Sequence, residues 1–365
     1  MSAEPEVITR VEGFAGRISL NRPRALNALT ADMCLAIAEA LVAWRDDDKV
    51  GSVIIDHAGD RGFCAGGDIR IVAQSGAGDG AEARRFFATE YRMNALLQGY
   101  AKPVVAIMDG IAMGGGVGLS MPARYRVATE RTVWAMPEGD IGLFPDVGAG
   151  WYLPRLPGEA GAWLALTGAR LRAADCLALG IATHVVPGDR VEALKTSLTS
   201  VCPREGGDPS SLNYPFRELM DLRLRVDDRL VGESALVAEH RPAIDRLFAH
   251  DTVEAIMSGL QADGSEWALA QHTIIARKCP TTLKVALRLV CEGARRATFA
   301  EEMAVEYAVA LRMSARPDFI EGVRALIVDK DNAPRWAPGS LAGVTDAMID
   351  AIFAPLPPAE AWTPL

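Results

Sequence analysis

Glu138 and Asp146 lie eight residues apart in the apolar stretch "AMPEGDIGLFPDVGAG", residues 135–150. A carboxylate in apolar surroundings tends to have a raised pKa and can act as an acid or a base near neutral pH. A structural role is the alternative for each. Asp146 follows Pro145 at an expected turn, where it could cap a helix through "GWYLPRL".

Two glycine-rich segments could supply backbone hydrogen-bond donors. "FCAGGDIR", residues 63–70, follows a strand-like segment, and "MDGIAMGGGVGLS", residues 108–120, follows "VVAI". Because glycine lets the backbone approach a ligand closely, two such turns meeting at one carbonyl oxygen would form an oxyanion hole. Two tight turns that pack a helix near a strand are the alternative, and composition alone favours that alternative.

Other motifs and reactive side chains give weaker indications of a functional site. "GAGDGA", residues 76–81, formally fits G-x-G-x-x-A, but it lacks a strand–turn–helix frame and is better interpreted as a loop than as a dinucleotide site. Cys64 has no histidine placed by sequence to activate it, which favours a small buried thiol. His184 is more typical of a structural histidine than of a base. The sequence contains no G-x-S-x-G motif, which argues against a serine hydrolase.

The elements that must position these residues follow an α/β pattern over the first half of the chain. Thr30 is placed to cap a helix over residues 31–44. The apolar, β-branched runs predict strands within residues 17–20, 50–57, 102–110, 125–129 and 132–138.

The second half of the chain has a different pattern. "CPREGGDPSS", residues 202–211, is typical of a linker or an exposed loop, and strand signals fade after it. Thr298 with Glu301 forms a capping-box pattern ahead of a helix, and Pro317 suits the first turn of another. We therefore predict a core over residues 1–201, which holds the site, and a mainly helical region over residues 202–365.

Composition narrows the class of protein. The chain has 365 residues, and its formal net charge of −9 without a basic stripe disfavours nucleic-acid binding. The sequence has no run of about 18 apolar residues, so it predicts no membrane span. The first residues, "MSAEPEVITR", resemble neither a secretory signal nor a transit peptide, so a cytoplasmic protein is expected.

The cysteines argue against a disulfide framework or structural zinc. The six cysteines are scattered, none forms a C-x-x-C pair, and no histidine lies near them at metal-binding spacing. No metal or redox cofactor is expected.

Four segments together resemble the crotonase (enoyl-CoA hydratase/isomerase) superfamily: "LNRPRALNALT", "FCAGGDIR", "GIAMGGGVGLS" and "WAMPEGDIGLFPDVGAGWYLPRL". Within that superfamily, "IGLFPDVG" and the tail "EGVRALIVDKDNAPRWAP" look like the 3-hydroxyisobutyryl-CoA hydrolase branch. The resemblance extends over nearly the whole chain. It implies a spiral of ββα units with a helical C-terminal region, and an acyl-CoA thioester as the substrate.

The resemblance also assigns binding residues by motif position. The N–H groups of Gly67 and Gly115 correspond to the pair that holds the thioester oxygen. Arg22, Arg24 and Ala65 fall in segments that bind CoA in relatives, although solvated surface arginines are the alternative.

The catalytic residues depart from the hydratase pattern. Typical hydratases carry two catalytic glutamates; the first position holds Gly118 here, and the second matches Glu138. The added Asp146 is a mark of the hydrolase branch. Glu90 of "TEYRMN" looks like a carboxylate that contacts substrate in that branch, and an ordinary exposed helix acid is its alternative.

The sequence therefore predicts hydrolysis of a short-chain 3-hydroxyacyl-CoA. Glu138 would attack the thioester carbonyl or activate water, and Asp146 would hold the substrate hydroxyl or the attacking water. An enoyl-CoA hydratase or isomerase is one alternative, and a non-catalytic CoA-binding protein is another. Assembly as a homo-oligomer is open, as is the pathway, whether valine catabolism or another acyl-CoA route.

Overall fold

The computed structural model describes residues 4–201 and 236–365. The linker expected at residues 202–211 lies outside the described residues, so the domain boundary at residue 201 stays a prediction. The chain forms two compact units, each assembled from three stretches of sequence. The first unit contains Met1–Gly67, Met93–Trp134 and Arg170–Glu239; the second contains Asp68–Arg92, Ala135–Ala169 and His240–Leu365.

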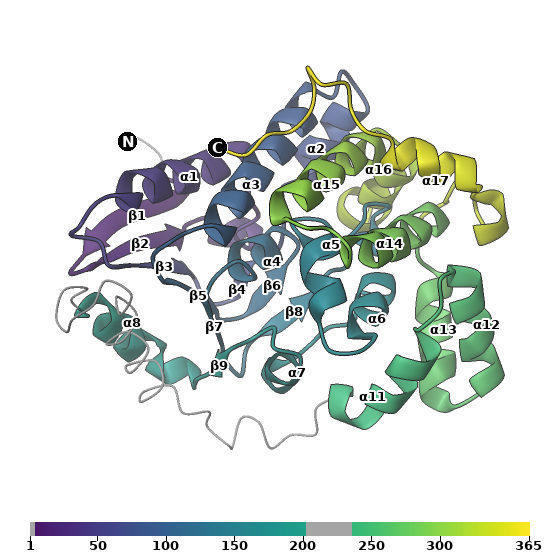
Figure 1. Ribbon diagram of the computed structural model, residues 1–365, viewed down its shortest axis with the longest axis horizontal. Helices are drawn as coiled ribbons and strands as arrows, with labels where there is room; N and C mark the ends of the chain where they lie inside the picture. The colour runs from purple at the N-terminus through teal and green to yellow at the C-terminus, as the bar shows by residue number, and fades with distance from the viewer. Residues whose placement is uncertain (1–3, 202–235) are drawn as a thin grey trace. The chain divides into compact units, whose positions relative to one another are not determined.

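A six-stranded sheet forms the centre of the first unit (Figure 1). β1 and β2 are antiparallel, and every later neighbour pairs in parallel. The strand order is β1 (Val7–Glu12), β2 (Ala15–Leu20), β3 (Ser52–His57), β5 (Val104–Met108), β7 (Tyr125–Ala128) and β9 (His184–Val185). The strands predicted within residues 17–20, 50–57, 102–110 and 125–129 are thereby confirmed, whereas β1 and β9 were not among the predicted strands.

Helices cover this sheet. α1 (Ala31–Arg45) packs against β1 and β2, and the Thr30 side chain accepts a hydrogen bond from Met33 N, as the cap prediction requires. α8 (Val191–Thr199) places Leu194 and Leu198 in a core with residues of β3, β5 and β7. α7 (Ala173–Ala178) also belongs to this unit.

A second sheet of three short strands carries the glycine-rich segments. Its order is β4 (Gly62–Cys64), β6 (Ile111–Met113) and β8 (Val133–Ala135). β4 and β6 are parallel, so their carboxyl ends lie at the same edge. In sequence, β4 leads into α2 (Ile69–Gly76) and β6 leads into α4 (Gly115–Ser120).

The strand expected over residues 132–138 is shorter than predicted. β8 ends at Ala135, and Glu138 begins a 3-10 turn, Glu138–Asp140, instead of ending a strand. Pro137 explains the difference, because it has no N–H for a sheet ladder and its φ of −89° with ψ of 14° turns the chain.

The second unit is mainly helical (Figure 1). It includes α5 (Ala149–Tyr152), α6 (Ala160–Thr167), α12 (Val253–Asp263), α13 (Glu266–Ala276), α14 (Pro280–Gly293), α15 (Phe299–Ser314), α16 (Pro317–Val323) and α17 (Asp346–Phe353). α3 (Ala81–Gln98) and α11 (Leu236–Leu247) contain residues of both units. Thr298 caps α15 and Pro317 begins α16, which confirms both sequence signals.

The elements around residues 76–81 test the interpretation of "GAGDGA". The "GAGDGA" segment joins α2 to α3, so it does not connect a strand to a helix as a dinucleotide site requires. Among residues 4–201 and 236–365, no helix has the length and apolar character needed to cross a membrane.

Gly116 tests how closely the two glycine-rich segments must approach. A Cβ added to Gly116 would lie 2.4 Å from the Cys64 carbonyl oxygen, so Gly116→Ala must push α4 away from β4. We expect a loss of about 2 kcal/mol in the free energy of unfolding, measured by urea denaturation. Gly99→Ala is the matched control, because a Cβ there would meet its nearest neighbour at an ordinary 3.6 Å. Equal stability of the two variants would contradict this packing.

Candidate active site

The two glycine-rich turns lie side by side in the first unit. Gly66 has a φ of +117°, and a Cβ on it would lie 3.9 Å from Gly115 N. Gly67 forms an isolated parallel bridge with Leu29, and Leu29 N donates to Gly66 O at 2.8 Å. The parallel pairing of β4 with β6 thus brings together the turns that contain Gly67 and Gly115.

The N–H groups of Gly67 and Gly115 are available as donors. Gly115 is the first residue of α4, where an amide has no partner inside its own helix. Across the described part of the chain, neither amide donates to a backbone carbonyl in a turn, loop or cap. Two such donors at adjacent turns can stabilise a developing oxyanion.

The segment expected to bind CoA is tied to the first of these turns. Ala65 N donates to Leu26 O at 3.0 Å, and Asn27 Nδ2 donates to Gly62 O at 2.9 Å. Asn27 has a φ of +56°, a left-handed conformation in which asparagine is enriched among residues other than glycine. These bonds place residues 22–29 directly beside the Gly66–Gly67 turn.

The two arginines of this segment differ. Arg22 is half-buried; its Nε pairs with Glu6 at 3.1 Å and its Nη1 donates to Ala28 O at 3.0 Å. Arg24 is exposed. Arg22 therefore has a structural role in shaping the segment, while Arg24 retains the position of a surface cation.

All three predicted site carboxylates are buried in the second unit. Glu90 on α3 is 2% exposed, Glu138 on the 3-10 turn is 6% exposed, and Asp146 before α5 is 5% exposed. Glu90 is therefore not the exposed helix acid that the sequence left as its alternative. Within the described residues, Glu90 Oε1 and Glu138 Oε2 are buried and accept no hydrogen bond.

These carboxylates shift one another's proton affinity. Burial raises the pKa of Glu138 well above its usual range, and the negative charge of Asp146 raises it further. Burial likewise raises the pKa of Glu90, with added repulsion from Asp146 and Glu138. Burial raises the pKa of Asp146 to about 7, although a hydrogen bond from Tyr91 opposes that rise. A group that titrates near neutrality, as Asp146 does, suits acid–base chemistry.

Asp146 is held by a side chain and not used as a helix cap. Tyr91 Oη donates to Asp146 Oδ2 at 2.7 Å. The residue before α5 is Gly148, and no side chain caps that helix, so the capping role considered for Asp146 is wrong. The left-handed Val147 and Gly148 turn the chain between Asp146 and α5.

Sequence reasoning missed three contacts around the predicted residues. Tyr91 adjoins Glu90 in sequence, but nothing in the pattern marked it as the partner of Asp146. Buried Lys278 pairs with Asp140 at 2.7 Å, and its charge partly offsets the rise in the pKa of Glu138. Asn94 Nδ2 donates to the carbonyl oxygen of Gly118 at 3.0 Å.

The side chains judged structural from sequence have structural surroundings. Cys64 is buried and its Sγ lies 3.6 Å from the Gly66 carbonyl oxygen. His184 Nδ1 lies 2.7 Å from Thr183 Oγ1. In the described ranges, no three His, Cys, Asp or Glu side chains are grouped to hold a metal ion.

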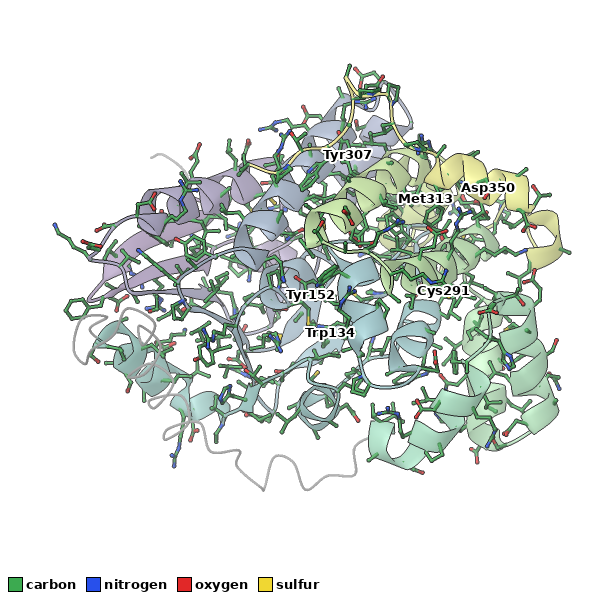
Figure 2. All side chains as sticks on the ribbon, viewed as in Figure 1. Trp134, Tyr152, Cys291, Tyr307, Met313 and Asp350 are labelled. Atoms are coloured by element: carbon green, nitrogen blue, oxygen red, sulfur yellow. The ribbon has the colours of Figure 1, made fainter. Side chains whose placement is uncertain are left out.

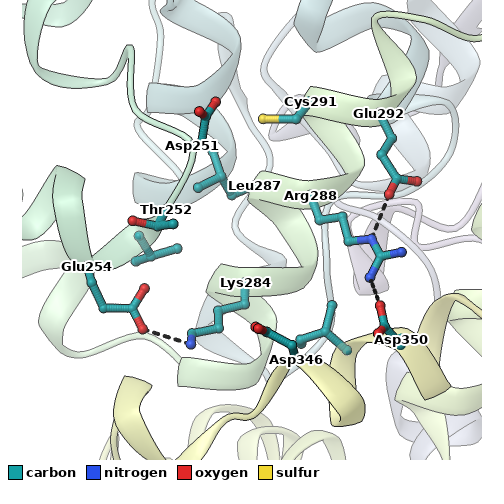
Figure 3. Close-up of a pocket in the computed structure, with 12 residues that line it drawn as sticks. Asp251, Thr252, Glu254, Lys284, Leu287, Arg288, Cys291, Glu292, Asp346 and Asp350 are labelled. Atoms are coloured by element: carbon teal, nitrogen blue, oxygen red, sulfur yellow. Dashed lines mark hydrogen bonds and ion pairs between the residues drawn. The ribbon is translucent and has the colours of Figure 1, made fainter.

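A separate pocket of about 350 Å³ lies within the second unit (Figure 3). Residues of α12, α14 and α17 line it, and two ion pairs, Lys284–Glu254 and Arg288–Asp350, occupy its wall. None of the three buried carboxylates lines this pocket. We therefore assign the chemistry to the carboxylate cluster and not to this pocket.

The raised pKa of Asp146 predicts a pH-dependent effect on stability. The folded protein favours neutral Asp146, so this contribution to stability is complete below about pH 4 and is lost as the pH rises through 7. Asp146→Asn stays neutral throughout. Relative to wild type, we expect it to add about 2 kcal/mol more to the free energy of unfolding at pH 8 than at pH 5.

Urea denaturation at the two pH values measures this difference. The exposed Asp60→Asn shows how much of the effect follows from the loss of any carboxylate. An Asp146→Asn effect that is equal at pH 5 and pH 8 would contradict the raised pKa.

Comparisons with known proteins identify the family of the chain. A family model described as enoyl-CoA hydratase/isomerase matches residues 15–353. A Danio rerio protein named 3-hydroxyisobutyryl-CoA hydrolase, mitochondrial, is 43% identical over 97% of this chain and 91% of its own length. The Homo sapiens protein of the same name is 41% identical over 97% of this chain and 90% of its own.

Two solved structures share the fold. A carnitinyl-CoA dehydratase from Mycobacterium thermoresistibile matches with a TM-score of 0.89 and 38% identity, covering 97% of this chain and 98% of its own. An enoyl-CoA hydratase from Rhodobacter sphaeroides matches with a TM-score of 0.85 and 36% identity, covering 98% of this chain and all of its own. Both similarities extend through the helical C-terminal region. The chain therefore belongs to the enoyl-CoA hydratase/isomerase family, the crotonase family.

Proposed function

We propose that this protein hydrolyses the thioester of a short-chain 3-hydroxyacyl-CoA, with 3-hydroxyisobutyryl-CoA as the substrate of first choice. The observation that carries the proposal is the buried cluster of Glu90, Glu138 and Asp146. Burial raises the pKa of all three, and repulsion between carboxylates further raises the pKa of Glu90 and Glu138. The substrate class comes from the names of the relatives that are 40–43% identical to this chain.

The glycine turns supply the first part of the mechanism. The amides of Gly67 and Gly115 donate to the thioester oxygen, on which negative charge develops during attack. Each such donor typically contributes about 3 kcal/mol to stabilisation of the transition state. Arg24 and the segment containing Arg22 and Ala65 bind the CoA part of the substrate, beside the turn that carries Gly67.

Glu138 performs the bond-making step by one of two routes. In the first, its carboxylate attacks the carbonyl carbon, CoA leaves as its thiolate, and water hydrolyses the mixed anhydride. In the second, Glu138 takes a proton from water, the water oxygen attacks the carbonyl carbon, and the C–S bond breaks. Both routes require the ionised form of Glu138. Its raised pKa makes that carboxylate a stronger base and also lowers the fraction of the protein in which it is ionised at a given pH.

Asp146 and Glu90 orient the reacting groups. Asp146 holds the substrate hydroxyl or the attacking water, with its own orientation set by the Tyr91 hydroxyl. Glu90 contacts the substrate from α3 through an oxygen that has no partner among the described residues. A non-catalytic CoA-binding protein would have no use for acids whose burial costs stability.

An enoyl-CoA hydratase is the second candidate function. It is favoured by the names of the two solved structures, a dehydratase and a hydratase. Glu90 also provides a second buried glutamate in the same unit as Glu138. Against it, Gly118 occupies the position of the first hydratase glutamate, and Asp146 has no place in that two-glutamate scheme.

Compartment, assembly and pathway stay predictions. The cytoplasmic location expected from the sequence stands beside vertebrate relatives that are named mitochondrial. A homo-oligomer and a place in valine catabolism are the corresponding expectations for assembly and pathway.

Removing either central carboxylate tests the proposal. We expect Glu138→Gln to lower kcat for CoA release on the order of 1,000-fold, and Asp146→Asn on the order of 100-fold, because each removes an acid–base or orienting group from the reaction. Free CoA is measured with a thiol reagent, using 3-hydroxyisobutyryl-CoA. Glu82→Gln, which changes an exposed acid on the same helix as Glu90, is the control and keeps wild-type turnover. Wild-type turnover in Glu138→Gln would exclude the proposed mechanism.

A further inference from the structure

One face of α15 supports the loop that carries Asp146. Phe299, Glu302 and Glu306 recur at helical spacing on that face. The Phe299 ring packs against Trp151 at 6.1 Å and Tyr152 at 5.6 Å between ring centroids. Figure 2 labels Tyr152 at the end of α5 and Tyr307 on α15. All these residues belong to the second unit.

The approach of this loop to α15 is too close for side chains at two positions. A Cβ on Gly148 would lie 2.7 Å from the Phe299 ring, and a Cβ on Gly150 would lie 2.0 Å from Glu302 Oε1. The backbone of residues 148–150 therefore packs directly against side chains of α15. The side chains of Phe299, Glu302 and Glu306 fill the space between α15 and this backbone, so a displacement of α15 would be transmitted through them.

Glu306 binds this backbone through both carboxylate oxygens. Its Oε2 accepts from Gly148 N at 2.7 Å, and its Oε1 accepts from Gly150 N at 3.0 Å. The side chain is fully buried. Burial raises its pKa, as does the charge of Glu302, whereas the two amide bonds favour the ionised form. Only a carboxylate offers an unprotonated acceptor to each amide at once.

The residue between Asp146 and Gly148 is strained. Val147 has a φ of +54°, a left-handed conformation that is rare for a β-branched residue and costs on the order of 1–3 kcal/mol. Such a conformation persists only where the surroundings hold it. The two amides bound by Glu306 begin immediately after Val147, so they are placed to hold it.

We propose that Glu306 is a positioning residue for Asp146, holding its loop from α15 while Tyr91 holds its carboxylate from α3. This inference rests on the proposed role of Asp146 in thioester hydrolysis. Glu306 touches neither Glu138 nor the substrate in this scheme. It acts by fixing the backbone that aims the Asp146 side chain.

A double-mutant cycle of Glu306→Gln and Asp146→Asn tests the proposal. Gln has the shape of Glu but presents an NH₂ group to one of the two amides. We expect Glu306→Gln alone to lower kcat for CoA release on the order of 10- to 100-fold, with KM changed less than about threefold, because a misplaced orienting group affects turnover. In the Asp146→Asn background, the same substitution should lower kcat less than about twofold.

The outcomes separate this inference from the proposed function. Wild-type kcat in Asp146→Asn alone would refute the role of Asp146, whatever Glu306 does. If Asp146→Asn is impaired but Glu306→Gln is fully active, the positioning role is wrong. It is also wrong if Glu306→Gln costs the same factor in both backgrounds, since Glu306 would then act independently of Asp146.

Glu302→Gln is the matched control. Glu302 is equally buried on the same helix, one turn earlier, and none of its hydrogen bonds in the described residues is to a loop amide. We expect its kcat to stay within about twofold of wild type; a loss equal to that of Glu306→Gln would overturn the specific role of the two amide bonds. If Glu306→Gln fails to fold, Glu306→Asp, which retains the charge but shortens the reach, enters the same cycle with the same criteria.

Discussion

The burial of several carboxylates in one helical unit is the constraint on which this structure depends. Glu90, Glu138 and Asp146 are nearly inaccessible, and the cation Lys278 offsets only part of their mutual repulsion. Desolvation and repulsion disfavour the charged forms of these carboxylates. The folded protein would therefore be more stable with neutral side chains at these positions. The same conditions make each carboxylate more basic, which is what a water-activating or nucleophilic group requires.

The rest of the fold positions backbone around this chemistry. In the first unit, the parallel pairing of β4 with β6 sets the Gly67 and Gly115 amides at neighbouring turns. In the second unit, Glu306 accepts hydrogen bonds from the amides of residues 148 and 150, which follow Asp146 in the chain. Close approach requires glycine at Gly116 in the first unit, where a Cβ would meet the Cys64 carbonyl oxygen. It also requires glycine at residues 148 and 150 in the second unit, where a Cβ would meet the Phe299 ring and the Glu302 carboxylate.

Local signals in the sequence predicted much of the fold but less of the site. Thr30, Thr298 and Pro317 mark helix starts through contacts within one turn, so each was predictable. Pro137 shortened an expected strand, and Asp146 bonds Tyr91 where a cap had been considered. The bond between Gly148 and Glu306 joins residues 158 positions apart. The hydrophobic periodicity of the sequence cannot predict such a contact, because it forms only when α15 packs against the loop.

The ratio of two products tests the central claim most directly. The unmodified protein would be given 3-hydroxyisobutyryl-CoA and, separately, crotonyl-CoA, with free CoA and the loss of the double bond followed in both. Rapid release of CoA from the hydroxyacyl substrate with negligible hydration of crotonyl-CoA is the result that this account predicts. Hydration of crotonyl-CoA without release of CoA would contradict it, and would assign the buried glutamates to proton transfer across a double bond.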